Sequence, residues 1–188
     1  MNPKELQRWE RIRSRFIETL PLRIQNDLIE ISPPKFDEPI IWSTFLHGPV
    51  GSGKTTQALF MLLEEMKQQF ITHELVSDKY IFISVPELLF QIKQTYNKTN
   101  SMTEEEIIEK YSEADFLILD DFGVERTTDW SFQLLYIIIN RRYDNMKKTV
   151  FTSNFSLGEL AERLGDERLT SRIQHMCVIK KFNGDYRI

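Results

Sequence analysis

The fold is decided by one octapeptide, Gly48-Pro49-Val50-Gly51-Ser52-Gly53-Lys54-Thr55, which has the spacing G-x-x-x-x-G-K-[ST]. Glycines at these positions let the backbone close around a polyphosphate, so that successive N–H groups and a helix N-terminus point at negative charge. In this pattern the lysine reaches the β- and γ-phosphates, and the hydroxyl of the last residue ligates Mg²⁺. We therefore expect residues 48–55 and Thr56 to bind a triphosphate such as ATP, with Thr55 on the Mg²⁺. A glycine-rich turn without a ligand is the alternative.

The sequence on both sides of this loop alternates between short apolar runs and amphipathic segments. An apolar run over residues 42–47 leads directly into the loop, and residues 55–70 follow it with apolar side chains at helical spacing. Later apolar runs predict strands at residues 80–84, 116–120, 149–153 and 177–182. Such runs separated by helices are typical of a parallel sheet that is covered on both faces. The expected fold class is therefore α/β, a three-layer P-loop NTPase with a parallel central sheet.

A second element comes from Phe116-Leu117-Ile118-Leu119-Asp120-Asp121, where four apolar residues lead to two acids. In open α/β sheets, ligands bind at the carboxyl ends of the strands. We expect Asp120 to hold Mg²⁺ through water, and Asp121 to orient or deprotonate the water that attacks the γ-phosphate. The pair is Asp-Asp rather than Asp-Glu, and the shorter second side chain predicts slow or partner-stimulated hydrolysis. An ordinary strand that runs into an acidic turn is the alternative.

The residues before the first expected strand differ in character. Residues 4–20 have apolar side chains at helical spacing with arginines between them, and residues 31–39 contain consecutive prolines that no helix can continue. We therefore divide the chain into an N-terminal amphipathic helix and linker, residues 1–40, and an ATPase domain, residues 41–188. The charged start, the single cysteine and the lack of an apolar run near the ~20 residues that span a bilayer predict a cytoplasmic protein outside membranes.

The charge of the chain bears on nucleic-acid binding. A formal net charge of −4 argues against proteins that coat nucleic acid indiscriminately, because such binding depends on counterion release by many lysines and arginines. Acidic residues outnumber basic ones over residues 1–125, and the balance is reversed over residues 126–188. A nucleic-acid surface is therefore expected in the C-terminal third. Solvated charged faces are the alternative of equal weight.

Five motifs follow one another in a fixed order: GPVGSGKT, FLILDDFGVE, TVFTSNFS, RLGDERLTSRI and GDYR. With this series the chain, from about Trp42 onward, resembles the AAA+ (ASCE) ATPase domain of the bacterial replicative-helicase loaders, the DnaC and DnaI family. It is also similar to the related IstB-type transposition helper ATPases. The resemblance implies an AAA+ fold without a helical lid domain, hydrolysis of ATP with Mg²⁺, and self-association through the nucleotide site.

The resemblance also implies roles for residues outside the phosphate loop. Asn154 matches the sensor residue that contacts the γ-phosphate or the lytic water; capping of the next helix is the alternative. Arg172 matches the arginine finger that reaches the nucleotide of a neighbouring subunit, with Arg168 as the other candidate. Surface ion pairs with adjacent carboxylates are the alternative for both. Arg187 matches the second sensor arginine, which acts on the nucleotide within its own subunit.

In loaders of this kind, residues just after the acidic strand and an aromatic side chain in the preceding helix line the path of single-stranded DNA. The matching positions are Tyr96, Thr128 and Trp130. Aromatic rings stack on bases and hydroxyls hold phosphate, while core packing is an equal alternative for the two aromatic residues. A group of basic residues could also contact the DNA backbone, and a solvated helix end is an equal explanation for their charge. These residues are Arg141, Arg142, Lys147 and Lys148.

Two functions agree best with this resemblance. The first is an ATP-controlled helicase loader in DNA replication, which binds single-stranded DNA and a DnaB-like hexameric replicative helicase. The second is an IstB-like helper, which binds duplex DNA and a transposase. Two alternatives come from other classes: a P-loop kinase of small molecules, and a nucleotide-binding adaptor that never hydrolyses ATP. The preference for single- or double-stranded DNA separates the first two.

Overall fold

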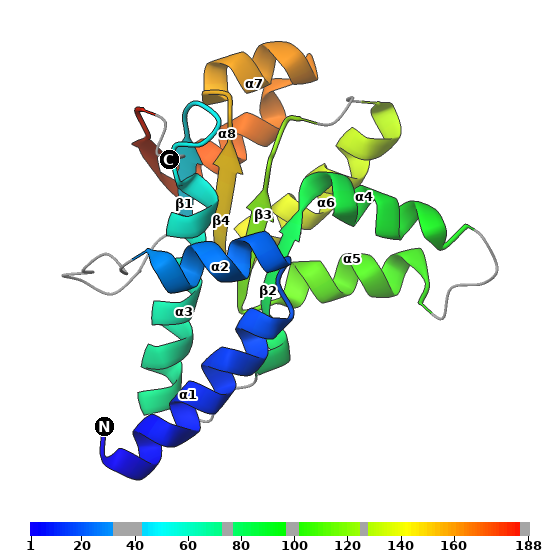
Figure 1. Cartoon of the computed structure of the whole chain (residues 1–188). Coiled ribbons are helices and arrows are strands. Elements are labelled where there is room, and N and C mark those ends of the chain that lie inside the picture. The colour runs from blue at the N-terminus through cyan, green and yellow to red at the C-terminus, as the bar shows by residue number, and fades with distance from the viewer. Residues whose placement is uncertain (32–42, 73–76, 97–101, 125–127, 185–188) are drawn as a thin grey trace.

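The elements of the chain are those of a computed structural model, which describes residues 1–31, 43–72, 77–96, 102–124 and 128–184. In chain order they are α1 (Pro3–Glu18), α2 (Leu22–Glu30), β1 (Ser43–His47), α3 (Lys54–Thr72), η1 (Ser77–Lys79), β2 (Tyr80–Ser84), α4 (Val85–Gln94), α5 (Glu104–Glu113), β3 (Phe116–Asp120), α6 (Asp129–Asp144), β4 (Lys148–Ser153), α7 (Leu157–Leu164), α8 (Glu167–Met176) and β5 (Cys177–Lys181) (Figure 1). None of the helices in these ranges is long and apolar enough to cross a bilayer.

The five strands form one sheet in the order β2-β3-β4-β1-β5, and every neighbouring pair is parallel. The strands are in register, so that one row of side chains crosses the sheet: Ile83, Leu119, Phe151, Phe45 and Ile179. Since all strands run the same way, their carboxyl ends share one edge. At this edge β1 passes into the phosphate loop and β3 ends at Asp120. The predicted parallel α/β sheet is confirmed.

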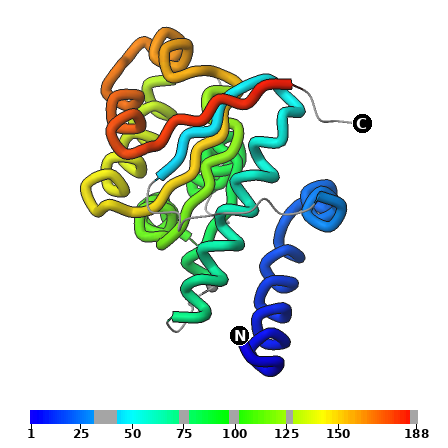
Figure 2. The backbone as a smooth tube through the Cα atoms, turned by 90° about the vertical axis from the view of Figure 1, so that its left-hand side faces the viewer, coloured from blue at the N-terminus to red at the C-terminus, as the bar shows by residue number. Residues whose placement is uncertain are grey.

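Helices cover both faces of the sheet and make three layers (Figure 2). On one face lies α3, with α1 and α2 packed against it, and strand residues such as Leu46 and Ile118 complete that core. The helices α4 to α8 cover the other face, where Phe45 and Leu119 are buried. Successive side chains of a strand point to opposite faces, so Phe45 and Leu46 belong to different cores. The predicted three-layer architecture is confirmed.

The N-terminal segment contains two helices rather than the single one expected. Pro21 occupies the N-cap position of α2, because proline cannot continue a helix but is tolerated where one begins. In α2 Leu28 is buried, whereas Leu22 and Ile29 are 72% and 76% exposed. Only Ile24 and Leu28, four residues apart, pack into the core, and this short stripe was not predicted from the sequence. The expected linker, apart from residue 31, and the boundary after residue 40 lie outside the described residues.

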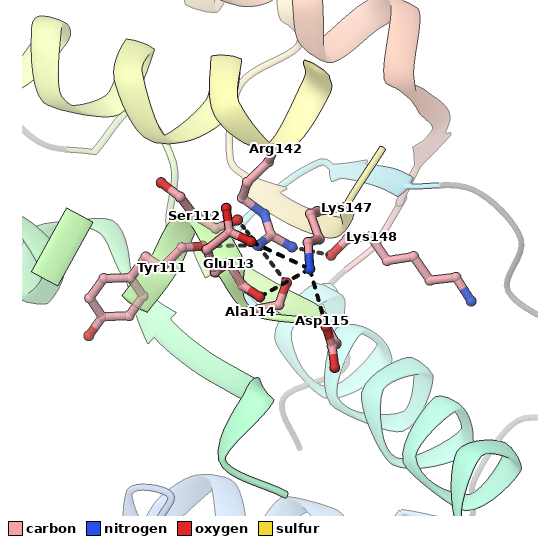
Figure 3. A network of polar contacts seen from close by, with 8 residues as sticks. All are labelled: Tyr111, Ser112, Glu113, Ala114, Asp115, Arg142, Lys147 and Lys148. Atoms are coloured by element: carbon pink, nitrogen blue, oxygen red, sulfur yellow. Dashed lines mark hydrogen bonds and ion pairs between the residues drawn. The ribbon is translucent and has the colours of Figure 1, made fainter. Parts of the chain in front are cut away.

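A buried arginine fastens the amino-end edge of the sheet to the helices (Figure 3). Arg142, in the last turn of α6, is fully buried and donates hydrogen bonds to five oxygen atoms. The acceptors are the carbonyls of Tyr111, Ser112, Ala114 and Lys148 and the hydroxyl of Thr149, at 2.6 to 3.1 Å. Burial lowers the pKa of Arg142 to about 9, and it remains charged at neutral pH. Because three of the carbonyls end α5, the helix dipole adds to the stabilisation of this cation.

The position of Arg142 corrects one expectation from the sequence. A side chain buried among backbone carbonyls cannot reach a DNA backbone, so the interpretation of Arg142 as a source of surface charge is wrong. Two other members of that basic group already pair with carboxylates of this chain. Lys147 lies 3.3 Å from Asp115, and Lys148 lies 2.7 Å from Glu65. The sequence shows these residues only as a charged helix end, because their partners are distant along the chain.

Candidate functional site

The phosphate loop, residues 48–53, joins the end of β1 to the start of α3. Its glycines 48, 51 and 53 all have positive φ angles, 149°, 82° and 82°. Glycine is required at position 48 for a second reason: a Cβ atom there would fall 2.3 Å from the carbonyl oxygen of Phe182. Phe182 in turn donates its N–H to the carbonyl oxygen of His47 at 2.7 Å. The residue after β5 thus holds the entrance of the loop in place.

Lys54 is folded into this loop and is 6% exposed. Its Nζ donates to the carbonyl oxygens of Gly48 and Pro49, both at 2.8 Å, and to the side chain of Asn154 at 3.1 Å. Burial lowers the pKa of Lys54, and the nearby charges of Asp121 and Asp120 oppose this shift. The predicted lysine and both predicted aspartates are therefore brought together at one edge of the sheet.

The other predicted loop residues surround this lysine. Ser52 is buried and accepts a weak hydrogen bond from Lys54 at 3.4 Å, whereas Val50 is 56% exposed on the loop. Thr55 and Thr56 lie half-buried in the first turn of α3. Backbone N–H groups in the first turn of a helix have no partner within the helix. The loop and this turn therefore have the form that an anionic phosphate group fits.

Two hydroxyl groups converge on Asp120. Thr55 donates to its Oδ1 at 2.8 Å, and Thr152 donates to the same atom at 2.6 Å. Asp120 is 6% exposed, and burial raises its pKa to about 6, against the opposing effect of both hydroxyls and Lys54. The Thr55 hydroxyl and the Asp120 carboxylate are hard oxygen donors in contact with each other, which is the type of donor that Mg²⁺ prefers.

Thr152 was not among the residues predicted from the sequence. Its hydroxyl donates to Asp120 and also accepts the backbone N–H of Asp121 at 3.0 Å, so one side chain on β4 fixes both acids of β3. A signal was present: Thr152 precedes Asn154 by two residues, and alternate residues of a strand point to the same side. Asp121 itself is exposed and has a φ of 57°. The chain therefore turns sharply there, in a conformation that aspartate adopts more readily than most residues.

Asn154 follows β4 and points at the phosphate loop, where its Oδ1 accepts the hydrogen bond from Lys54. The alternative role, as the cap of α7, belongs to another residue. Ser156 is the N-cap of that helix and forms a reciprocal capping box with Glu159. The side chain of Asn154 thus remains with the nucleotide-site candidates.

The two candidate finger arginines lie on α8 and differ in their partners. Arg168 forms a bidentate ion pair with Asp166, in which Nε donates to Oδ1 at 3.0 Å and Nη2 donates to Oδ2 at 2.6 Å. Arg172 instead donates to the amide oxygen of Asn140 and to a backbone carbonyl, and its guanidinium lies 4.6 Å from the ring centroid of Tyr136. The ion-pair alternative thus holds for Arg168; for Arg172, no carboxylate of the described residues lies within ion-pair distance. Arg187 lies outside the described residues.

The three residues predicted to face single-stranded DNA lie close together. The indole Nε1 of Trp130 donates to the hydroxyl of Tyr96 at 3.0 Å, although 34 positions separate them. Tyr96 is 60% exposed and donates in turn to Glu104, whereas Trp130 is half-buried and packs against the core. Thr128 is the N-cap of α6 and accepts a hydrogen bond from the backbone of Ser131 at 3.1 Å. Core packing is therefore part of the role of Trp130 but not of Tyr96.

Comparisons with known proteins agree with this geometry. A family model described as IstB-like ATP binding protein matches residues 7–188. The replicative helicase loader DnaC of Buchnera aphidicola subsp. Baizongia pistaciae is 29% identical over 94 residues, which are 50% of this chain and 38% of that protein. The match thus spans well under half the length of this curated relative.

Two solved structures share the fold. The crystal structure of the DnaC helicase loader superposes with a TM-score of 0.62 at 26% identity, covering 86% of this chain and 87% of that one. The crystal structure of DnaI superposes with a TM-score of 0.59 at 22% identity, covering 86% of this chain and 81% of that one.

Proposed function

The chain belongs to the IstB-like ATP-binding protein family, and we propose that it is an ATP-hydrolysing helicase loader. The observation that carries the proposal is the convergence of Lys54, Thr55, Asp120 and Asn154 at the carboxyl edge of the sheet. A helicase-loading role is supported by the relatives and solved structures named for DnaC and DnaI. The partner would be a DnaB-like replicative helicase.

The triphosphate would bind along the loop and the first turn of α3. Lys54 would exchange its carbonyl acceptors for phosphate oxygens, which carry more negative charge and lie in the same concave loop. The contacting oxygen donors of Thr55 and Asp120 fit Mg²⁺. When bound, Mg²⁺ would neutralise charge on the phosphate oxygens during transfer.

Hydrolysis requires a water molecule in line with the bond that breaks. Asp121 would orient this water and accept its proton, as the oxygen of water bonds to the γ-phosphorus and ADP leaves with the bridging oxygen. Asn154 would hold the γ-phosphate or the water. Because Asp121 is exposed and shorter than a glutamate, turnover would be slow until a neighbouring copy supplies Arg172.

Nucleotide and assembly would then stabilise each other. A finger that touches the phosphate of the next subunit binds only when ATP is present, and by linkage ATP binds more tightly in the assembly. The Tyr96–Trp130 pair offers an exposed aromatic ring for stacking on a base of single-stranded DNA. Hydrolysis would loosen the interface and release the helicase.

A second function keeps one specific observation in its favour. The family model that matches nearly the whole chain is that of IstB-like proteins, so an IstB-like helper that binds duplex DNA and a transposase is the other candidate. The nucleotide chemistry would be the same for both functions. They differ in the strandedness of the DNA and in the protein partner.

The deciding experiment is a pair of pull-downs with the purified chain. A replicative helicase and a transposase are offered separately, each with ATP and with ADP, while ATP turnover is measured with single-stranded and with duplex DNA. The loader predicts retention of the helicase with ATP, release with ADP, and stimulation by single-stranded DNA. Retention of the transposase and stimulation by duplex DNA would replace it with the helper function.

A further inference from the structure

A cluster of aromatic and cationic side chains lies where α8 packs against α6. The rings of Phe132 and Tyr136 stack at 6.2 Å between centroids with an interplanar angle of 21°. Both arginines of α8 lie over these rings: Arg168 is 5.5 Å and Arg172 is 4.6 Å from the centroid of Tyr136. Asn140, one turn further along α6, accepts a hydrogen bond from Arg172. We call these five residues the α6–α8 cluster.

The two arginines of the cluster differ in the charge of their partners. Arg168 is bound bidentately by the carboxylate of Asp166, which raises the pKa of the guanidinium and cancels its charge locally. Arg172 is held by neutral groups only: the amide oxygen of Asn140, the backbone carbonyl of Arg168 and the face of Tyr136. Its positive charge is therefore not compensated by a contact in the cluster.

Neutral contacts of this kind restrict the conformation of a side chain without neutralising its charge. An arginine carries considerable rotamer freedom, and a flat ring on one side with a fixed acceptor at Nε limits the plane of its guanidinium. The acceptor is itself oriented, because the Nδ2 of Asn140 donates to Asp144 at 2.7 Å, which presents the Oδ1 to Arg172. Such an arrangement is preorganised for an anion that arrives from outside the chain.

We propose that Tyr136 and Asn140 are positioning residues that hold Arg172 ready for the triphosphate of a neighbouring copy. The inference rests on the proposed function, in which Arg172 acts across a subunit interface. Tyr136 fixes the plane of the guanidinium by its ring, and Asn140 fixes its direction through Nε. Arg168 belongs to the same cluster as a structural member, since its guanidinium already has a carboxylate partner in Asp166.

The test uses substitutions that separate the contributions of the Tyr136 ring and the Asn140 acceptor to turnover from general effects of changing α6. Tyr136→Leu removes the ring, Tyr136→Phe keeps it, and Asn140→Ala removes the acceptor. Tyr143→Leu is the control, because Tyr143 is a half-buried tyrosine two turns further along α6 and lies outside the cluster. For each variant, kcat and KM for ATP are measured with single-stranded DNA, and the Kd of ATP is measured by calorimetry.

We expect Tyr136→Leu and Asn140→Ala to lower kcat about tenfold and to leave the Kd of ATP for the unassembled chain unchanged, because a misplaced finger acts on the neighbour's nucleotide and not on the variant's own pocket. Tyr136→Phe retains most of the turnover, and Tyr143→Leu matches the unmodified chain. Mixing Tyr136→Leu with Asp121→Asn subunits restores turnover, since the latter keep an intact finger. Mixing Tyr136→Leu with Arg172→Ala subunits restores none.

The outcomes separate the inference from the function on which it rests. If Arg172→Ala abolishes turnover while Tyr136→Leu and Asn140→Ala keep it, the positioning roles are wrong and the finger remains. If Tyr136→Phe is as damaging as Tyr136→Leu, the ring is not the determinant and the inference is overturned. If Arg172→Ala retains full turnover, the proposed trans finger fails and the positioning roles fail with it.

Discussion

Lys54 and Asn154, one hundred positions apart in the sequence, are joined by a hydrogen bond of 3.1 Å from the lysine Nζ to the amide oxygen. The bond connects Lys54, directly after the phosphate loop, with the residue that follows β4. The loop follows β1, and β1 and β4 are neighbouring strands in the sheet. A phosphate oxygen that takes the lysine from its present acceptors would also change the partner of Asn154. The geometry therefore couples the occupancy of the loop to the residue proposed to contact the γ-phosphate.

The buried carboxyl of Asp120 gives stability a distinctive dependence on pH. Its pKa is raised from the ordinary 3.8 to about 6 in the folded chain, mainly by burial. Between these values the folded protein holds a proton that the unfolded chain has released, so the free energy of unfolding falls as pH rises from about 4 to about 6, by at most about 3 kcal/mol. Urea unfolding of the chain and of Asp120→Asn, in EDTA at pH 4 and at pH 7, measures this change in the free energy of unfolding.

We expect the two proteins to have similar stabilities at pH 4, because asparagine resembles the protonated acid. At pH 7 Asp120→Asn becomes the more stable of the two. A difference between them that does not change with pH would contradict the raised pKa.

The contrasting partners of the two α8 arginines predict contrasting losses of activity. Arg172→Ala lowers turnover about 10³-fold, since an arginine finger contributes this much to phosphoryl transfer, and leaves the affinity of the unassembled chain for ATP unchanged. Arg168→Ala removes a surface ion pair with Asp166 and changes turnover about threefold or less. Steady-state hydrolysis together with ATP titrations compares them. Equal losses from both substitutions would contradict the assignment.

The exposed ring of Tyr96 is expected to contribute to binding of single-stranded DNA. Tyr96→Ala weakens binding by about 1–3 kcal/mol, because stacking on one base is lost. Fluorescence anisotropy with a labelled oligonucleotide measures the change, and Tyr143→Ala, in the last turn of α6, serves as the control. An affinity unaffected by Tyr96→Ala would remove this residue from the DNA path.

Glu104 should act in the opposite direction in the same assay. Its carboxylate accepts a hydrogen bond from the hydroxyl of Tyr96 and places negative charge beside the proposed DNA path. Glu104→Gln therefore tightens binding, whereas Glu105→Gln, a matched loss of charge in the same turn, changes it less. Equal effects of the two would reduce the role of Glu104 to general electrostatics.

Stability should depend strongly on Arg142 and weakly on its neighbour. Arg142→Leu leaves several buried carbonyl oxygens without a donor and costs about 3–5 kcal/mol. Arg141→Leu is the control, because this exposed side chain precedes Arg142 in the same helix and its loss costs about 0.5 kcal/mol or less. Chemical unfolding of both variants checks the contrast, and similar losses would contradict the buried network.

Local patterns in the sequence were sufficient for the sheet and for much of the candidate site. The glycines of the phosphate loop and the apolar run that ends at Asp120 each occupy one short segment, so their structure follows from neighbouring residues. The parallel topology then brings the ends of β1, β3 and β4 to one edge, which explains why Lys54, Asp120 and Asn154 could be grouped from the sequence.

Contacts between distant segments could not be predicted in this way. In the sequence Arg142 is one of two arginines at a charged helix end. Its acceptors on α5 and β4 are backbone carbonyls, which no sequence pattern identifies. The same holds for Tyr136 and Asn140, which meet Arg172 only because α8 packs on α6. Thr152 is intermediate, since its alternation with Asn154 was visible but its hydrogen bond to Asp120 was not.

The most direct measurement is calorimetric titration of Mg·ATP into the chain and into Lys54→Ala, with Lys67→Ala on the outer part of the same helix as the control. We expect saturable binding to the chain and to Lys67→Ala, and a loss of affinity of about 100-fold or more for Lys54→Ala, because the buried ammonium is the cation enclosed by the loop. Absence of binding to the unmodified chain, or equal affinity in all three proteins, would contradict the nucleotide site.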